Sequence, residues 1–238
     1  MKLPMRIWRL ITSPLFGISL ILLLGSVLFF SGVVTKFRDR FTSDGVNNYV
    51  ANELKHQLAR DSKVPSQAVI FLGDSITHDL AAESVVDIAV NYGIGGMTSA
   101  QLLGALPAYT SLHRAKTIVL MIGINDWGHG GAVGLQDRLK AIESALPRAK
   151  PLIWNAIMPA GGSPQRMADI AVTNQFIRTL CASRPGCIYL DTWQFLASPD
   201  GIRLDRLYVD SLHLNGDGYH LWASALRHAL QRATTSIK

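Results

Sequence analysis

The main part of this sequence has almost no excess of charge of either sign. The 238 residues carry a formal net charge of +6, but residues 1–40 alone hold six basic residues and one acidic residue. Only +1 is therefore left for residues 41–238. Nucleic-acid-binding domains usually gather Lys and Arg on one face. The near balance of charge excludes such a basic footprint, so we predict no nucleic-acid partner.

Cysteine is scarce as well: Cys181 and Cys187 are the only two, six positions apart around a Ser-Arg-Pro-Gly turn. Two cysteines make a poor structural zinc site, and no strong spacing of metal-ligating residues occurs elsewhere. We therefore predict no metal. In an oxidising compartment the two thiols could form a disulfide that closes a small loop, whereas in the cytosol they would stay free. The sequence leaves these two states open.

Charged residues are absent between Ile11 and Thr35, and the part from Leu15 to Phe30 is almost entirely aliphatic or aromatic. About 20 apolar residues suffice to cross a bilayer. The alternative is a cleaved signal peptide, but its apolar core is usually about 7–15 residues long, and no Ala-x-Ala-like cleavage site follows here. We therefore predict an N-terminus over 1–10 and an uncleaved transmembrane signal anchor over 11–35.

Basic residues flank the predicted anchor on both sides, so they orient it only weakly. A short basic N-terminus usually stays in the cytoplasm, and everything large in this chain follows the apolar segment. We therefore expect a single-pass protein of the bacterial inner membrane, with residues 1–10 in the cytoplasm. Its main domain would lie on the extracytoplasmic side, which is the periplasm in a Gram-negative cell.

The part after the anchor divides at the end of a polar linker. Residues 36–66 are predicted to hold this linker and an amphipathic helix, because apolar residues recur at positions 46, 49, 50, 54 and 58. From 67 to 238 apolar runs alternate with helical patterns. The predicted strands are 68–72, 85–91, 117–122, 152–158 and 188–191; the predicted helices are 76–83, 98–112, 134–146, 165–183 and 216–232. This order favours a parallel, doubly wound, three-layer α/β domain.

The first predicted strand ends in Gly73-Asp74-Ser75. Ligands of open α/β sheets bind at the carboxyl ends of the strands, which makes Ser75 a candidate nucleophile. The alternative is that Asp74 or Ser75 only caps the next helix, as such residues usually do. The stretch alone does not decide between the two roles.

Three further polar clusters follow in the chain, and each comes after an apolar strand or lies in a loop. They could all converge on one edge of the sheet. They are Asn91-Tyr92-Gly93-Ile94-Gly95-Gly96, Gly123-Ile124-Asn125-Asp126 and Asp210-Ser211-Leu212-His213.

With Gly73-Asp74-Ser75, these clusters in this order resemble the SGNH hydrolase superfamily, also called GDSL esterases and lipases, over about residues 68–222. The resemblance implies a flavodoxin-like sandwich with a five-stranded parallel sheet. It also implies Ser75 as nucleophile, Asp210 and His213 as its triad partners, and Gly96 and Asn125 as oxyanion-hole donors. It requires no cofactor.

Elementary chemistry explains why such residue types belong together. A serine hydroxyl is a weak nucleophile near neutral pH, so a base such as His213 must take its proton. A carboxylate such as Asp210 can hold the other imidazole nitrogen and stabilise the imidazolium. Negative charge then develops on the carbonyl oxygen, and the amides of Ser75 and Gly96 with the Asn125 side chain could stabilise it.

Two positions depart from the usual pattern of the superfamily. Met97 stands where members often have aspartate, and Leu214 where they often have proline after the histidine. Neither replaces a catalytic atom, but Met97 removes a possible polar contact beside the oxyanion hole. Among the other histidines, His78 is expected to point along the helix after Ser75, and His129 could line the mouth of the site, although a surface role is the default.

The expected function is a membrane-anchored serine esterase that removes small O-acyl groups, acetyl above all. Its partners would be an O-acylated small molecule or polysaccharide, the inner membrane through residues 11–35, and a polysaccharide synthesis or export complex. Two alternatives stay open. A sugar hydroxyl could replace water as acceptor, which would make the protein an O-acyltransferase, or the domain could be a non-catalytic module that binds glycans or assists assembly.

Overall fold

The computed structural model describes residues 43–128, 132–161, 163–198, 201–208 and 210–235. The predicted cytoplasmic N-terminus (1–10), the predicted anchor (11–35) and His129 lie outside these ranges. Within the ranges, no helix combines the length and the apolar character that crossing a membrane requires.

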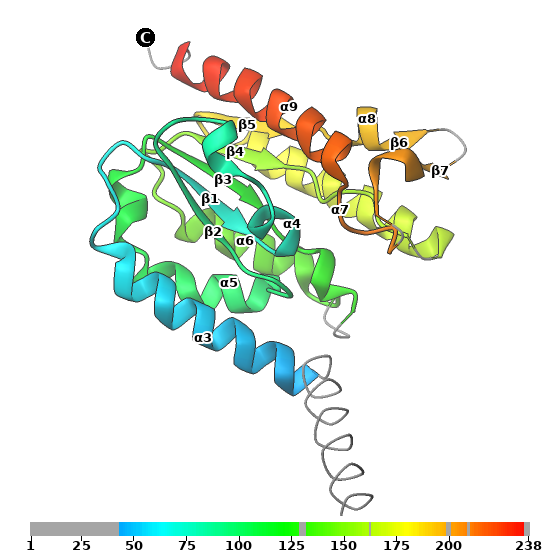
Figure 1. Cartoon of the computed structure of the whole chain (residues 1–238), viewed down its shortest axis with the longest axis horizontal. Helices are drawn as coiled ribbons and strands as arrows, with labels where there is room; N and C mark the ends of the chain where they lie inside the picture. Colours follow the sequence, from blue (N-terminus) through cyan, green and yellow to red (C-terminus); the bar gives the residue numbers. More distant parts are fainter. Residues whose placement is uncertain (1–42, 129–131, 162, 199–200, 209, 236–238) are drawn as a thin grey trace, which may run out of the picture. The chain divides into compact units, whose positions relative to one another are not determined.

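A five-stranded parallel sheet forms the centre of the domain, as predicted (Figure 1). Its strand order is β2-β1-β3-β4-β5, the order of doubly wound flavodoxin-like sheets. In such a sheet the strand order reverses between β1 and β3, and ligands bind in the crevice outside the carboxyl ends of these two strands. The strands are β1 (Val69–Gly73), β2 (Ala89–Gly93), β3 (Thr117–Met121), β4 (Leu152–Asn155) and β5 (Cys187–Leu190).

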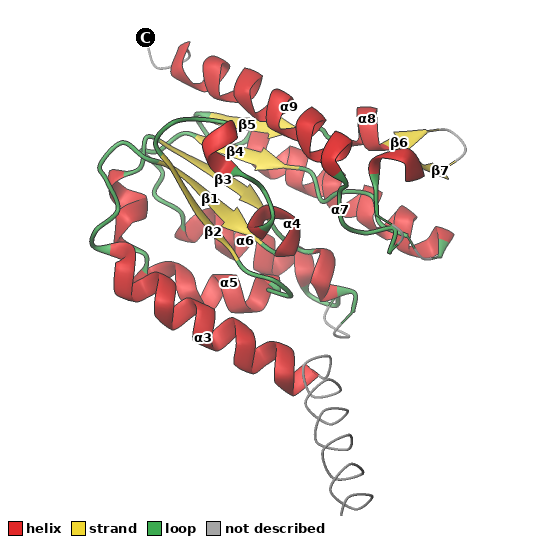
Figure 2. Ribbon diagram, viewed as in Figure 1, coloured by secondary structure: helices red, strands yellow, loops and turns green. Residues whose placement is uncertain are grey.

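Helices connect and cover the strands, and a two-stranded antiparallel ribbon precedes the last helix (Figure 2). The helices are α3 (Ser43–Asp61), α4 (Ser75–His78), α5 (Ser99–Ala105), α6 (Leu135–Ala145), α7 (Pro164–Ala182), α8 (Trp193–Leu196) and α9 (Gly216–Thr235). The ribbon joins β6 (Ala197–Ser198) to β7 (Gly201–Ile202). Short 3-10 turns are η1 (Ala82–Ser84), η2 (Leu106–Ala108), η3 (Thr110–Arg114), η4 (Ile124–Asp126) and η5 (Leu204–Arg206).

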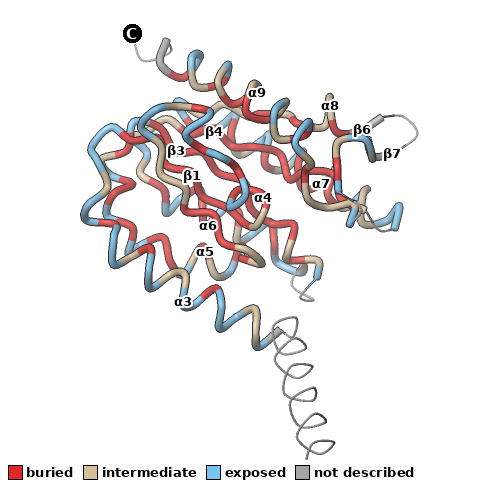
Figure 3. The backbone as a smooth tube through the Cα atoms, viewed as in Figure 1, coloured by how far each residue is buried: buried red, intermediate tan, exposed pale blue. Residues whose placement is uncertain are grey.

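Both faces of the sheet are covered, which explains why β1 and β3 are continuous apolar runs (Figure 3). On one face, alternate residues of the strands pack with α4 and α9 around the buried Trp222. The opposite face is covered by α5, α6 and α7 (Figure 1). This arrangement is the predicted three-layer α/β sandwich.

Several predicted elements differ from the structure in length. The predicted helix 98–112 is interrupted, because Pro107 has no N–H to continue α5, and the chain goes on as η2 and η3. The predicted helix 76–83 is only α4 followed by η1, and the predicted strand 85–91 is shifted to β2. The predicted strand 152–158 stops at Asn155, because the main-chain N–H and C=O of Ile157 bond to the side chain of Asn174 instead.

Helix α3 contributes buried polar groups to the compact unit that runs from residue 49 onward. Gln57 is 3% exposed, and its Oε1 accepts a hydrogen bond from the Tyr109 hydroxyl at 2.5 Å. The Asp61 carboxylate accepts from Tyr92, Thr110 and Ser111. Burial works to raise the pKa of Asp61, but these hydrogen bonds hold it below its ordinary value. The C-terminal part of α3 is thus fixed within this unit by specific polar contacts.

Cys181 and Cys187 are joined by a disulfide, the first of the two states that the sequence left open. The bond closes a loop that contains Arg184, whose side chain is fully buried. Arg184 donates to the carboxylate and main-chain oxygen of Glu143 and to the Pro147 carbonyl. The disulfide loop is therefore tied to the end of α6.

Candidate active site

The turn from β1 into α4 places a serine at the first position of a helix. Asp74 is the N-cap, and its Oδ1 accepts from the Ile76 amide at 3.1 Å. A side chain at Gly73 would put a Cβ within 2.4 Å of the Met121 carbonyl, so only glycine allows this tight turn. The cap and the candidate nucleophile proposed from the sequence are thus two adjacent residues, Asp74 and Ser75.

Ser75 lies within hydrogen-bonding distance of a histidine that is 138 positions away in the chain. The distance from its Oγ to His213 Nε2 is 2.8 Å, and His213 Nδ1 lies 2.7 Å from Asp210 Oδ2. An ionised carboxylate can only accept, so Nδ1 carries the proton and Nε2 accepts from the serine hydroxyl. The three side chains form one continuous hydrogen-bonded chain.

The loop that carries Asp210 and His213 is held by its own polar groups. Asp210 Oδ1 accepts from the amides of Leu212 and His213, both at 3.0 Å. Ser211 has φ +54°, and its carbonyl accepts from the Gly161 amide at 2.6 Å. Gly161 must lack a side chain, because a Cβ there would lie 2.6 Å from the Ser211 Cβ. The loop after β4 therefore supports the histidine loop.

Two carboxyl groups of the site differ in their electrostatics. Partial burial works to raise the pKa of Asp210, but hydrogen bonds from the His213 ring and from the Leu212 and His213 amides hold it below its ordinary value. Asp74 is 1% exposed, and burial raises the pKa of its carboxyl to about 7. Asp210 is thus ionised beside the imidazole at neutral pH.

The predicted oxyanion residues follow neighbouring strands at the same edge of the sheet. Gly73 is in register with Gly93 of β2 and with Met121 of β3. Ser75, Gly96 and Asn125 come two, three and four residues after these positions. Gly96 has φ +75°, a conformation that favours glycine. Asn125 Nδ2 donates to the Met97 carbonyl at 3.0 Å, which fixes Asn125 against the Gly96 turn.

The sequence did not mark a buried ionic cluster beside Asn125. Asp126 is 2% exposed and accepts from the amide and hydroxyl of Ser99, at 2.9 and 2.6 Å, and from Arg138 Nη2 at 3.0 Å. Arg138 Nε also donates to the Ser99 hydroxyl. The start of α5 is thereby joined to η4. An aspartate next to a candidate oxyanion residue was the available signal, but its partners are distant in sequence.

The two departures from the superfamily pattern have structural explanations. Met97 is fully buried, so its side chain packs in the core and only its carbonyl meets Asn125. Leu214 is also fully buried, in the core around Trp222, and it pairs with Leu207 in an isolated bridge. His78 is turned against β2, since its Nδ1 lies 3.1 Å from the Gly93 carbonyl.

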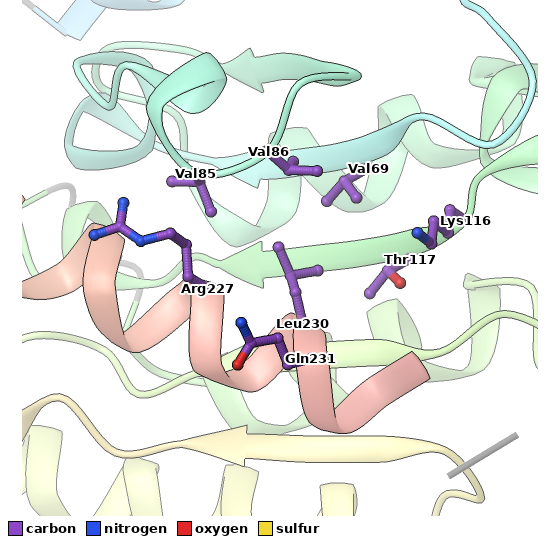
Figure 4. Close-up of a pocket in the computed structure, with 8 residues that line it drawn as sticks. All are labelled: Val69, Val85, Val86, Lys116, Thr117, Arg227, Leu230 and Gln231. Carbon is purple, nitrogen blue, oxygen red and sulfur yellow. The ribbon is translucent and has the colours of Figure 1, made fainter. Parts of the chain in front are cut away.

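The pocket in Figure 4 is not part of this site. It has a volume of about 240 Å³ and is lined by residues that include Val69 and Thr117, the first residues of β1 and β3, together with Arg227 of α9. The serine follows the opposite end of β1. Within the described ranges, no group of three or more His, Cys, Asp or Glu side chains is arranged to hold a metal ion.

Residues 71–221 match the profile of the GDSL-like Lipase/Acylhydrolase family. The chain belongs to this family. Among curated proteins, it is 27% identical over 193 residues to the platelet-activating factor acetylhydrolase IB subunit alpha1 of Bos taurus, covering 76% of this chain and 83% of the relative.

Two solved structures share the fold. A Streptococcus pneumoniae protein provisionally described as a platelet activating factor has a TM-score of 0.71 at 20% identity, covering 84% of this chain and 99% of that one. The C-terminal catalytic domain of the peptidoglycan O-acetyltransferase A of Streptococcus pneumoniae has a TM-score of 0.60 at 17% identity, covering 71% and 96%. These two structures show that the chain shares their fold.

Proposed function

We propose that this family member is a serine esterase that hydrolyses small O-acyl esters, with Ser75, His213 and Asp210 as its catalytic triad. The observation that carries the proposal is the continuous hydrogen-bonded chain from the Ser75 hydroxyl through the His213 ring to the Asp210 carboxylate. That chain ends at the first residue of α4, where the Ser75 amide has no carbonyl of its own helix to bond.

In the first half of the reaction, Ser75 Oγ attacks the acyl carbon while His213 Nε2 takes the hydroxyl proton. The oxyanion accepts from the amides of Ser75 and Gly96 and from Asn125, whose side-chain amide has a second N–H besides the one bonded to Met97. Each such donor contributes about 2.7–4 kcal/mol to transition-state stabilisation. His213 then protonates the alcohol oxygen as the ester bond breaks.

In the second half, water attacks the acyl-serine and His213 takes its proton. The tetrahedral intermediate collapses, the carboxylic acid leaves, and His213 returns the proton to Ser75 Oγ. Asp210 remains ionised throughout and stabilises the imidazolium, which agrees with the lowered pKa of its carboxyl. Every proton that leaves Ser75 is thus restored to it within one cycle.

Acetyl is the acyl group that we propose, on a small molecule or on a cell-envelope or exported polysaccharide. Support comes from the names of two relatives, an acetylhydrolase and a peptidoglycan O-acetyltransferase. We further propose that residues 11–35 anchor the protein in the bacterial inner membrane with the domain outside the cytoplasm. Support for this placement comes from the disulfide, since such bonds persist in oxidising compartments. A polysaccharide synthesis or export complex is the partner that we propose there.

A fluorophosphonate probe tests the nucleophile on the full-length protein in detergent. We expect wild type to be labelled and to release acetate from p-nitrophenyl acetate and acetylated polysaccharide. Ser75→Ala should lose labelling and at least about 10⁴-fold in kcat. Ser84→Ala, which changes an exposed serine of η1, is the matched control and should behave as wild type. Equal labelling of wild type and Ser75→Ala would refute the assignment.

An O-acyltransferase is the second candidate, and the likeness to the O-acetyltransferase domain favours it. The acyl-serine would be the same, but a sugar hydroxyl would attack it instead of water. Product analysis distinguishes the two: with an acetyl donor and a glycan acceptor, a transferase yields acetylated glycan in preference to free acetate.

A further inference from the structure

Asn91 of β2 makes a set of hydrogen bonds that the proposed mechanism does not use. Its Nδ2 lies 2.7 Å from the Thr77 carbonyl, 3.0 Å from that of Leu80 and 3.3 Å from that of His78. Its Oδ1 accepts from the Gly93 amide at 2.8 Å. One side-chain amide therefore bonds to the end of α4 and to the end of β2.

Helix α4 needs such a partner because it is only four residues long. The last carbonyls of any helix lack intrahelical donors, and a single turn is unstable alone. Asp74 satisfies an amide at the start of α4, and the Tyr219 hydroxyl donates to the Ile76 carbonyl at 3.0 Å. Asn91 supplies the donors at the other end, so the helix that carries Ser75 is held in place by side chains from outside it.

The end of β2 lies directly against α4. A Cβ at Gly93 would be 2.3 Å from the His78 amide nitrogen, so the contact requires glycine. The Gly93 carbonyl also lies 3.1 Å from His78 Nδ1, and the Ile94 amide donates to the Gly73 carbonyl at 3.0 Å. Gly96 follows three residues after Gly93. The serine helix and the oxyanion turn are therefore attached to each other at Asn91 and Gly93.

We infer that Asn91 is a positioning residue, which fixes the Gly96 amide relative to Ser75 so that both donors meet the same oxyanion. This role rests on the proposed esterase function. The oxyanion position is occupied only as the reaction proceeds, so a loss of alignment raises the barrier and leaves ground-state binding nearly unchanged. A misplacement of about 1 Å in such a site can cost about 10²-fold in rate.

The test compares two half-buried side chains that donate to main-chain carbonyls, those of Asn91 and Arg114, in the full-length protein. Asn91→Ala should lower kcat for p-nitrophenyl acetate by about 10- to 100-fold with KM within about threefold. Fluorophosphonate labelling should slow in parallel. Arg114→Ala is the matched control, because Arg114 Nη2 donates to the main-chain carbonyls of Asp61 and Val64, which lie before the first residue of β1, at the end opposite Ser75. It should lose stability but keep kcat within about threefold.

A second variant covers the case in which Asn91→Ala does not fold. Asn91→Asp keeps the side-chain size and the acceptor for the Gly93 amide, but it loses the donors to the α4 carbonyls, so its kcat should fall by at least about tenfold. If folded Asn91 variants kept the kcat of Arg114→Ala, the role of Asn91 would be refuted while the esterase function stood. A wild-type protein inert to both ester and probe would overturn the function itself, and the role with it.

Discussion

The two halves of the proposed active site are built in opposite ways. Ser75, Gly96 and Asn125 follow the neighbouring strands β1, β2 and β3, of which β2 is at the edge of the sheet. The residues next to Ser75 and Asn125 are buried: Asp74 is 1% and Asp126 2% exposed. Asp210 and His213 lie instead on a loop between β7 and α9, with side chains 48% and 28% exposed. Ser75, Gly96 and Asn125 are thus half-buried residues that stand on the core, whereas Asp210 and His213 lie on a more exposed loop.

This difference shows which interactions can fix a catalytic atom. In the buried half, close main-chain packing, glycines without room for a side chain and the hydrogen bonds of Asn91, Tyr219 and Asp126 together determine the positions. In the exposed half, a few hydrogen bonds do so: Asp210 bonds the His213 ring and two loop amides, and Gly161 bonds Ser211. Substitutions in the exposed half should therefore change activity with little effect on stability, and substitutions in the buried half should change stability as well.

The largest expected effect tests the exposed half. In Asp210→Asn, the side-chain oxygen can still accept from the loop amides, but the new NH₂ group cannot accept from His213 Nδ1. The imidazole then adopts the wrong tautomer, and kcat should fall by about 10³- to 10⁴-fold. Since Asp210 is exposed, the free energy of unfolding measured in urea should change by less than about 1 kcal/mol.

Asp205→Asn is the matched control for this variant. Asp205 is a similarly exposed aspartate, and it pairs with Arg203 and Arg206. Its kcat should stay close to that of wild type. A loss of several kcal/mol of stability in Asp210→Asn would contradict the distinction between the two halves.

The next effect tests the buried half through its dependence on pH. Burial raises the pKa of Asp74 from 3.8 to about 7, so between these values the native carboxyl keeps a proton that the unfolded one has lost. Stability contributed by this group must then fall as the pH rises through that window and stay constant above it. The Asp74→Asn side chain cannot titrate, so its free energy of unfolding relative to wild type should rise with pH, by at most about 4 kcal/mol.

Urea unfolding of both proteins at several pH values between 4 and 8 measures this difference. Asp137→Asn, on the exposed surface of α6, serves as the control and should show no such trend. A difference between Asp74→Asn and wild type that stays the same at every pH would show that the Asp74 carboxyl ionises normally.

The smallest effect concerns the support of the histidine loop. In Gly161→Ala the new Cβ would meet the Ser211 Cβ at 2.6 Å, so the loop must move and His213 with it. We expect kcat to fall about tenfold. Gly104→Ala is the control, since a Cβ there meets nothing within 4 Å. This variant should stabilise α5 by about 0.5–1 kcal/mol and leave kcat unchanged. Equal kcat in both variants would mean that Gly161 does not position His213.

The sheet was predictable from sequence because β1 and β3 are buried on both faces and therefore read as unbroken apolar runs. Boundaries were less predictable where a side chain from another element competes with sheet pairing. The Asn174 side chain bonds to the main-chain N–H and C=O of Ile157, so β4 ends early. Nothing in the sequence around Asn174 indicates this contact. The ribbon of β6 and β7 is too short to give an alternating pattern.

For the site, the residues with chemistry were predictable and those that hold them were not. Ser75, Asp210 and His213 stand in recognisable clusters, and the structure brings them into one hydrogen-bonded chain. Their roles remain a proposal. Asn91 stands in a recognised cluster too, but its partners are main-chain carbonyls, which leave no trace in a sequence. Gly161 is required because the Ser211 side chain leaves no room for a Cβ at position 161, and a sequence does not show that contact.

The place of the histidine loop in the chain has an evolutionary consequence. It follows the last strand of the five-stranded sheet and precedes only α9, so none of the five strands depends on its length. Insertions and deletions around Tyr208, a residue that is 59% exposed, can change the surface beside His213 without shifting the register of any strand. Family members can therefore diverge in substrate while Ser75 and the proposed oxyanion donors keep their positions.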